Sequence, residues 1–78
     1  MKKTFKGHKS KVTAVDFHPN LKQLASSSED ATIFIWSFNP NLRPFKFTGH
    51  RGAVYDLSFS HTGEYLASAS KDGTVRIW

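Results

Sequence analysis

Serine, histidine and aspartate, the residue types of a hydrolytic triad, occur in two sets of matched spacing in this chain. The sets lie forty-two positions apart and consist of His8, Ser26 and Asp30, and of His50, Ser68 and Asp72. A hydrolase needs one nucleophile beside one base, together with an oxyanion hole. Here the same residues hold equivalent places in two units, and each set is followed by a tryptophan, Trp36 or Trp78. This repetition indicates a structural role, and we expect no enzymatic activity.

Metal and cofactor sites find no support in the sequence. The 78 residues include no cysteine, which excludes disulfides and thiolate metal sites within the chain. The four histidines, His8, His18, His50 and His61, show neither His-x-His nor His-Glu-x-x-His spacing. We therefore expect no metal, no cofactor and no small-molecule substrate.

A membrane or secretory location is also disfavoured. The longest apolar run is Ile33-Phe34-Ile35-Trp36, far below the roughly 18 residues of a membrane span. Lys6, His8 and Lys9 stand where a signal peptide would have its apolar stretch. The sequence thus predicts a protein of the cytosol or nucleus without membrane contact.

Basic residues are concentrated near the N-terminus. Eleven Lys and Arg against six Asp and Glu give a formal net charge of +5. The first eleven residues include Lys2, Lys3, Lys6, Lys9 and Lys11. Such a field favours an acidic partner, such as nucleic acid, a phospholipid surface or an acidic protein like tubulin, although a solvated face that aids solubility is the alternative. Nucleic acid is disfavoured because no stacking strip or recognition helix is apparent.

An internal repeat organises the chain. Residues 5–36 align with residues 47–78 without a gap, and thirteen of the thirty-two positions are identical. Each unit contains a β-branched and aromatic stretch, at 12–17 and 54–59, followed by a small-residue strand at 24–28 or 65–70. Further strands are expected at 32–36, 45–47 and 74–78. No segment has a sustained helical period, so the sequence predicts an all-β fold.

The repeated residues resemble the WD-repeat family. The resemblance rests on Phe-x-Gly-His followed by Leu-Ala-Ser-x-Ser-x-Asp-x-Thr-x-x-Ile-Trp, which occurs in both units. It implies antiparallel four-stranded blades of a β-propeller, and the spacing agrees with a period of ~40–45 residues. It also implies hydrogen-bonded structural tetrads, here His8, Ser26, Asp30, Trp36 and His50, Ser68, Asp72, Trp78. Ser28 and Ser70 are the alternative hydroxyls.

The same resemblance divides the chain into three parts. Residues 1–5 are expected to be an outer strand that would close a ring, residues 6–48 a first repeat with its linker and outer strand, and residues 49–78 a second repeat without its outer strand. Two blades cannot close a propeller, which has ~4–8. We expect an incomplete part of a seven-bladed ring.

Particular segments resemble the proteome-of-centriole WD-repeat proteins. These segments are 19–26 and 36–47, together with the opening Phe-Lys-Gly-His-Lys. The resemblance implies a scaffold of centrioles and basal bodies that binds and stabilises triplet microtubules, with tubulin or other centriolar components as partners. The alternative is a general WD-repeat adaptor, such as a ubiquitin-ligase receptor, a splicing component or a regulator of microtubule severing.

Family members often contact partners through three positions in each blade. These positions correspond to Lys11, Thr13 and Glu29 in the first unit and to Ala53, Tyr55 and Lys71 in the second. Tyr55 is the strongest candidate because an aromatic ring with a polar tip is typical of binding hot spots. The alternative for Tyr55 is a strand residue that a neighbouring blade half-covers.

Overall fold

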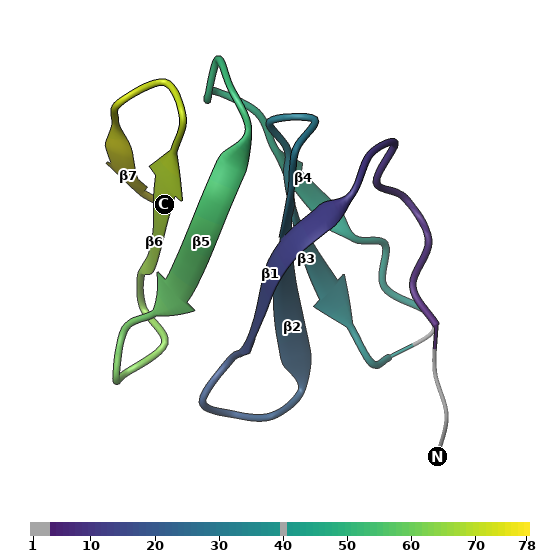
Figure 1. Ribbon diagram of the computed structural model, residues 1–78. Helices are drawn as coiled ribbons and strands as arrows, with labels where there is room; N and C mark the ends of the chain where they lie inside the picture. Colours follow the sequence, from purple (N-terminus) through teal and green to yellow (C-terminus); the bar gives the residue numbers. More distant parts are fainter. Residues whose placement is uncertain (1–3, 40) are drawn as a thin grey trace.

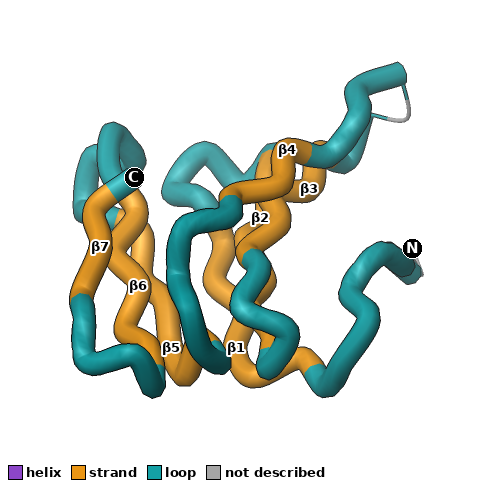
Figure 2. The backbone as a smooth tube through the Cα atoms, turned by 90° about the horizontal axis from the view of Figure 1, so that it is seen from above, coloured by secondary structure: helices purple, strands orange, loops and turns teal. Residues whose placement is uncertain are grey.

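The chain folds into two antiparallel β-sheets that pack face to face (Figures 1 and 2). The structure is a computed structural model, and it describes residues 4–39 and 41–78. The first sheet has the strand order β1-β2-β3-β4 and the second has the order β5-β6-β7. The strands are β1 (Val12–Phe17), β2 (Gln23–Ser28), β3 (Ile33–Ser37), β4 (Phe45–Phe47), β5 (Val54–Phe59), β6 (Leu66–Ser70) and β7 (Val75–Ile77). The predicted all-β class is therefore confirmed.

The two units fold alike because their strands and turns use the same local chemistry. β1 and β5 carry β-branched and aromatic residues that suit a pleated surface. Each pairs with the next strand through a register shift, between Val12 and Ala14 in the first unit and between Val54 and Asp56 in the second. At each shift the first strand has one extra residue, so the residues that follow pair one place away from where a regular strand would put them. Strict alternation of side chains along the strand does not predict this change.

The core lies between the two sheets. Ala25 and Ile33 of the first sheet and Val54, Leu57 and Leu66 of the second form one buried apolar cluster. The two sheets contribute non-equivalent faces to this core. The second sheet contributes the face that carries Val54 and Leu57 of β5. The first sheet contributes Ala25 and Ile33 of β2 and β3, which lie on the face opposite to the repeat equivalents of Val54 and Leu57.

Three hydrogen bonds connect the sheets around this core. The Thr13 hydroxyl donates to the Val54 carbonyl at 2.6 Å. The backbone N–H of Phe59 donates to the Asp16 carboxylate at 2.8 Å. On the side of the β1–β2 loop, the His18 ring nitrogen Nε2 lies 3.1 Å from the Gly63 carbonyl. The contact between the sheets is thus fixed by polar groups as well as by apolar packing.

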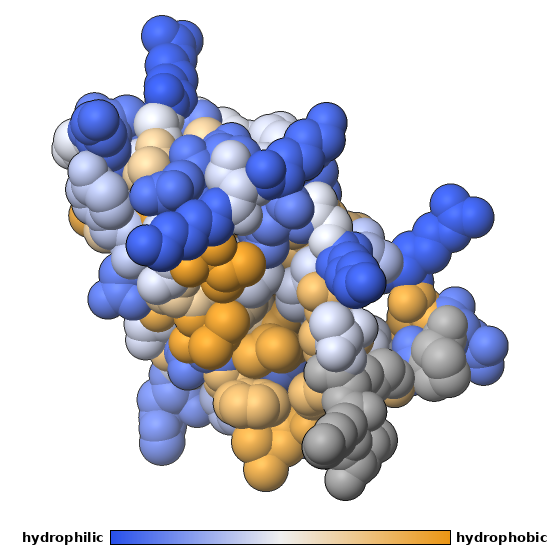
Figure 3. Space-filling model, turned by 45° about the vertical axis from the view of Figure 1, so that its right-hand side comes forward, coloured by the Kyte–Doolittle hydropathy of each residue, from blue (hydrophilic) through white to orange (hydrophobic). Residues whose placement is uncertain are grey.

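The outward face of the first sheet exposes apolar side chains. Val12, Val15 and Phe17 are 48%, 59% and 53% exposed, although they are the repeat equivalents of Val54, Leu57 and Phe59. Figure 3 shows apolar side chains gathered on the face turned toward the viewer. On the second sheet, Val75 and Ile77 are also exposed. Each sheet therefore keeps one apolar surface that the other sheet does not cover.

Loops gather at two opposite edges of the molecule (Figure 1). We call the edge with the residues 8–11, 29–32, 48–53 and 71–74 the upper rim, and the edge with 18–22, 60–65 and the described part of 38–44 the lower rim. Of the expected outer strand at 1–5, Thr4 and Phe5 have no strand structure, and the other three residues lie outside the described part. Among the described residues, no helix is long and apolar enough to cross a membrane.

Candidate functional site

A hydrogen-bonded network connects the side chains of the first unit that recur in the second. The Ser26 Oγ atom is its centre, since it lies 2.7 Å from His8 Nε2 and 2.7 Å from Trp36 Nε1. On the other side of the imidazole ring, His8 Nδ1 lies 3.0 Å from Thr32 Oγ1. The Thr32 hydroxyl in turn donates to the Asp30 carboxylate. The four residues of the first predicted tetrad are therefore brought together, with Thr32 between His8 and Asp30.

The second unit repeats this arrangement with one difference. Ser68 Oγ lies 2.7 Å from His50 Nε2 and 2.9 Å from Trp78 Nε1. His50 Nδ1, however, reaches the Asp72 carboxylate directly at 3.1 Å. The Thr74 hydroxyl lies 3.3 Å from the same His50 nitrogen and also donates to Asp72. The two networks thus share their centre and differ in how the histidine contacts the turn.

The donors in the first network fix the tautomer of His8. The Trp36 indole can only donate, so Ser26 accepts from it and uses its own hydroxyl proton to donate to His8 Nε2. The Thr32 hydroxyl proton goes to Asp30, so His8 Nδ1–H donates to Thr32. This assignment makes His8 a neutral imidazole with its proton on Nδ1. All the donors then point in one direction, from the indole toward the carboxylate.

The surroundings of His8 favour its neutral form. Burial lowers the pKa of His8 below its ordinary value of 6.5, and the nearby positive charge of Lys46 acts in the same direction. The Asp30 carboxylate, 3.9 Å from Nδ1, and a hydrogen bond with the backbone of Ser26 oppose this shift. Because burial is the largest effect, His8 is uncharged at neutral pH, in agreement with the tautomer assigned above.

The aspartates connect the turns to the loops that precede each unit. Asp30 accepts from the backbone N–H of Lys9 at 2.9 Å, and Asp72 accepts from that of Arg51 at 2.9 Å. Burial raises the pKa of Asp30, but the hydrogen bonds from Thr32, Lys9 and Ser28 outweigh it and lower the pKa to about 2. Hydrogen bonds from Thr74 and Arg51 also lower the pKa of Asp72. Both carboxylates are thus held charged and in place.

The network geometry does not favour nucleophilic catalysis. Ser26 and Ser68 are 5% and 1% exposed, and each hydroxyl already accepts from an indole and contacts a histidine. A catalytic serine must instead be open to a substrate carbonyl, beside donors for the oxyanion. Such buried and fully paired polar groups typically fix local geometry.

The alternative hydroxyls Ser28 and Ser70 have another task. Ser28 Oγ accepts from the backbone N–H of Asp30 at 3.2 Å, and Ser70 Oγ accepts from that of Asp72 at 3.1 Å. Ser70 also lies within hydrogen-bond distance of the Gly52 and Ala53 carbonyls. These serines therefore hold the turns of the upper rim and do not contact the indoles.

No metal centre is found in the part of the chain that the structure describes. Within residues 4–39 and 41–78, no three His, Cys, Asp or Glu side chains are grouped so that they could hold an ion.

Four of the predicted partner-contact residues lie on the upper rim, in two adjacent pairs. The backbone N–H of Glu29 donates to the Lys11 carbonyl at 3.0 Å, and the N–H of Lys71 donates to the Ala53 carbonyl at 2.9 Å. The side chains of Lys11, Glu29 and Lys71 are exposed. The matching pairs come from equivalent positions of the two units, so the rim repeats along the molecule.

The remaining two partner-contact candidates differ in exposure. Thr13 is half-buried, and its hydroxyl contacts Ser27 Oγ at 2.8 Å as well as the Val54 carbonyl, so it takes part in the contact between the sheets. Tyr55 is 56% exposed. Tyr55 thus keeps the exposure that a contact with a partner requires, while the Thr13 hydroxyl is already bonded within the chain.

Sequence reasoning missed the threonines of the two networks. Thr32 and Thr74 follow their aspartates by two residues, and each backbone N–H and hydroxyl donates to that aspartate. The sequence signal that could have revealed them is that a threonine occupies this position in both units. An Asp-x-Thr sequence in a turn is also suited to this local pairing, because the Asp side chain accepts from the residue two places later.

Comparison with known proteins agrees with this geometry. The family model "WD domain, G-beta repeat" matches residues 1–37 and 43–78. POC1 centriolar protein homolog B of Xenopus laevis is 55% identical over 47 residues, which are 60% of this chain and 10% of that protein.

Two further relatives give the same result. POC1 centriolar protein homolog A of Xenopus tropicalis is 49% identical, and homolog B of Mus musculus is 46% identical, each over 60% of this chain and 11% and 10% of the relative. The chain thus spans about a tenth of the length of the curated relatives it matches. The predicted resemblance is confirmed, and the chain belongs to the WD-repeat family.

Proposed function

We propose that this chain is part of a non-enzymatic scaffold of centrioles and basal bodies. The observation that carries the proposal is its 46–55% identity to proteins named as centriolar, over 60% of its length. The buried hydrogen-bonded networks support a structural role, since they use the Ser, His and Asp side chains to hold loops and not to bind a substrate. The repeat boundaries proposed at 6–48 and 49–78 place one such network in each unit.

The upper rim is the surface that we propose for the partner. Its side chains include the exposed cations Lys9, Lys11, Arg51 and Lys71. The carboxylates of Asp30 and Asp72 accept from backbone N–H groups within the rim, which leaves Glu29 as the outward acidic side chain among the described residues of this rim. The resulting positive surface suits an acidic protein, and the proposed partner is tubulin in the triplet microtubules of the centriole.

Specific contacts must add to this electrostatic attraction. Exposed charges are screened beyond ~8 Å at physiological ionic strength, so they raise the association rate more than they select a partner. Tyr55, exposed on β5, is the proposed aromatic contact for selectivity. Lys11 and Lys71, exposed on the upper rim, complement an acidic surface.

Co-sedimentation of the intact protein with microtubules tests the proposal. The variant Lys9→Ser/Lys11→Ser should bind several-fold more weakly and with a smaller dependence on salt. The matched control is Lys22→Ser/Arg43→Ser, which removes two exposed cations from the lower rim and should bind as the unchanged protein does. Equal binding by both variants would overturn the assignment of the upper rim. Tagged protein that labels nuclei uniformly and never basal bodies would favour the general WD-repeat adaptor.

A further inference from the structure

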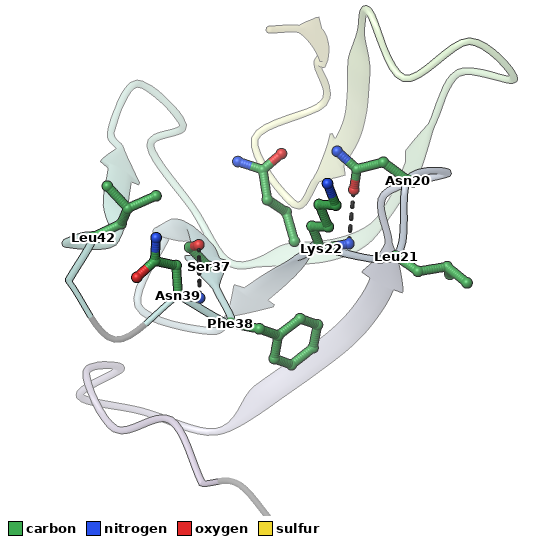
Figure 4. Close-up of a pocket in the computed structure, with 8 residues that line it drawn as sticks. Asn20, Leu21, Lys22, Ser37, Phe38, Asn39 and Leu42 are labelled. Atoms are coloured by element: carbon green, nitrogen blue, oxygen red, sulfur yellow. Dashed lines mark hydrogen bonds between the residues drawn. The ribbon is translucent and has the colours of Figure 1, made fainter.

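A second candidate surface lies on the lower rim, away from the networks. Here the β1–β2 loop and the segment after β3 enclose a hollow of about 390 Å³. In Figure 4, Leu42 and Leu21 stand on opposite sides, with Ser37 and Phe38 between them. Leu21 and Leu42 are 70% and 58% exposed. Two large apolar side chains therefore flank one hollow at the surface.

Leu21 has a backbone conformation that favours glycine. Its φ angle is +59°, in the left-handed region, where Gly63 of the second unit, at the equivalent position, has a φ angle of +81°. A residue with a Cβ atom loses about 1–2 kcal/mol in this conformation. The Leu21 side chain is largely exposed, so burial within the chain does not offset this loss. A strained residue with an exposed apolar side chain is typical of a functional position.

The polar side chains that line the hollow are directed at their own loops. Asn20 Oδ1 accepts from the backbone N–H of Lys22 at 2.8 Å. Ser37 Oγ accepts from the N–H of Asn39 at 3.1 Å, and Asn39 Oδ1 accepts from that of Asn41 at 2.9 Å. Two of these bonds are drawn in Figure 4. These bonds satisfy the three side chains within their own loops, and the leucines and Phe38 form the apolar lining of the hollow.

The charged side chains of the two segments that form the hollow have one sign. Lys22 lines it, and Arg43 follows directly after Leu42. The sequence segments 17–28 and 37–47 together contain no Asp or Glu. A ligand with acidic groups beside an apolar side chain is complementary to this surface in both respects.

We propose that the hollow on the lower rim binds an acidic peptide segment of a partner protein. One leucine or aromatic side chain of the segment enters between Leu21 and Leu42. Flanking Asp or Glu residues of the segment pair with Lys22 and Arg43. The central apolar contact supplies most of the affinity. The two rims can then hold two partners at once, because they lie at opposite ends of the strands.

Selection from a displayed library of random ten-residue peptides on the intact protein tests this proposal. We expect enrichment of sequences with Leu, Phe or Met flanked by Asp or Glu. Replacing the central apolar residue of a selected peptide with Ala should weaken binding about tenfold, as loss of a buried leucine-sized contact requires. Enrichment of basic peptides, of apolar peptides without acidic residues, or of none would overturn the proposal.

Two glycine variants separate binding from folding. Leu21→Gly relieves the left-handed strain and removes the side chain, so the selected peptide should bind about tenfold more weakly while the melting temperature does not fall. Ala31→Gly is the matched control, since Ala31 also has a positive φ angle, +72°, but lies in the β2–β3 turn of the upper rim. It should leave peptide binding intact. Unchanged binding by Leu21→Gly would contradict the proposal.

Discussion

The Nε1–H group of Trp36 donates a hydrogen bond of 2.7 Å to the Oγ atom of Ser26. The two residues lie on the neighbouring strands β3 and β2, two positions apart in register, because Trp36 pairs with Leu24, and both are buried. Because Ser26 also contacts His8, one hydroxyl group connects a strand, its neighbour and the loop before β1. Ser68 has the same position in the second unit.

Removing this hydroxyl group should destabilise the fold without affecting any chemistry. Ser26→Ala leaves the Trp36 N–H and the His8 ring without their partner, and the expected loss in the free energy of unfolding is about 1–3 kcal/mol. Urea denaturation of the intact protein measures it. The control Ser58→Ala alters an exposed serine whose hydroxyl donates to the adjacent Phe59 carbonyl, and it should change stability by less than about 0.5 kcal/mol. Equal effects of the two changes would contradict the role of Ser26.

A double-mutant cycle then isolates the bond itself. Trp36→Phe removes the indole N–H, so its effect and that of Ser26→Ala should not be additive. We expect a coupling energy of about 0.5–3 kcal/mol, the range for residues in one network.

Two glycines should respond differently to the same substitution. Gly63 and Gly73 both have positive φ angles, +81° and +87°. A Cβ atom at Gly63 would lie 2.5 Å from the His18 ring, whereas nothing lies within 4 Å of one at Gly73. Gly73→Ala should therefore lose only the left-handed backbone term, about 1–2 kcal/mol.

Gly63→Ala should lose more, because it also displaces His18 from the contact between the sheets. Thermal unfolding of the two variants side by side measures the difference. If the variants melt at the same temperature, the contact between His18 and Gly63 does not contribute to stability.

Acid should lower stability in two ranges of pH. The folded state lowers the pKa of His8 below 6.5, so the unfolded chain binds that proton more tightly and stability falls as the pH drops below about 6.5. The pKa of Asp30 is lowered from 3.8 to about 2. Its contribution is therefore complete above about 3.8 and is lost as the pH falls toward 2, and Asp72 acts in the same direction.

Chemical denaturation across this pH range measures both effects. Asp30→Asn should reduce the loss below pH 4 and preserve a decline below about 6.5. A stability that does not change between pH 7 and pH 3 would contradict this account.

The fold could be predicted from sequence because its signals are local and occur twice. The β-branched stretches at 12–17 and 54–59 coincide with β1 and β5, the stretch at 45–47 coincides with β4, and the stretch at 74–78 exceeds β7 by one residue at each end. The expected strands at 24–28 and 65–70 begin one residue away from the observed ones, at Gln23 and Leu66. Repetition made these assignments more certain than either unit alone would.

Contacts between the units could not be predicted in this way. Asp16 accepts from the backbone of Phe59 and His18 contacts Gly63, but their repeat equivalents, Ser58 and Ser60, are different residues. No local pattern marks such a pair, because its partner lies more than forty residues away. The left-handed φ angle of Leu21 was missed for a related reason, since a leucine carries no signal for that conformation.

The contact between the two sheets is heterologous, since each sheet presents a different surface to the other. Such a contact has a direction, and further units of the same kind can be added by repeating it, in a series that closes when the rotation per unit allows. Each side chain at the contact then has to match only the unit next to it. Asp16 must accept a hydrogen bond from the backbone of Phe59. Its counterpart Ser58 is exposed, so the residue at that position can differ. Repeats with this polarity can diverge one boundary at a time while their shared architecture persists.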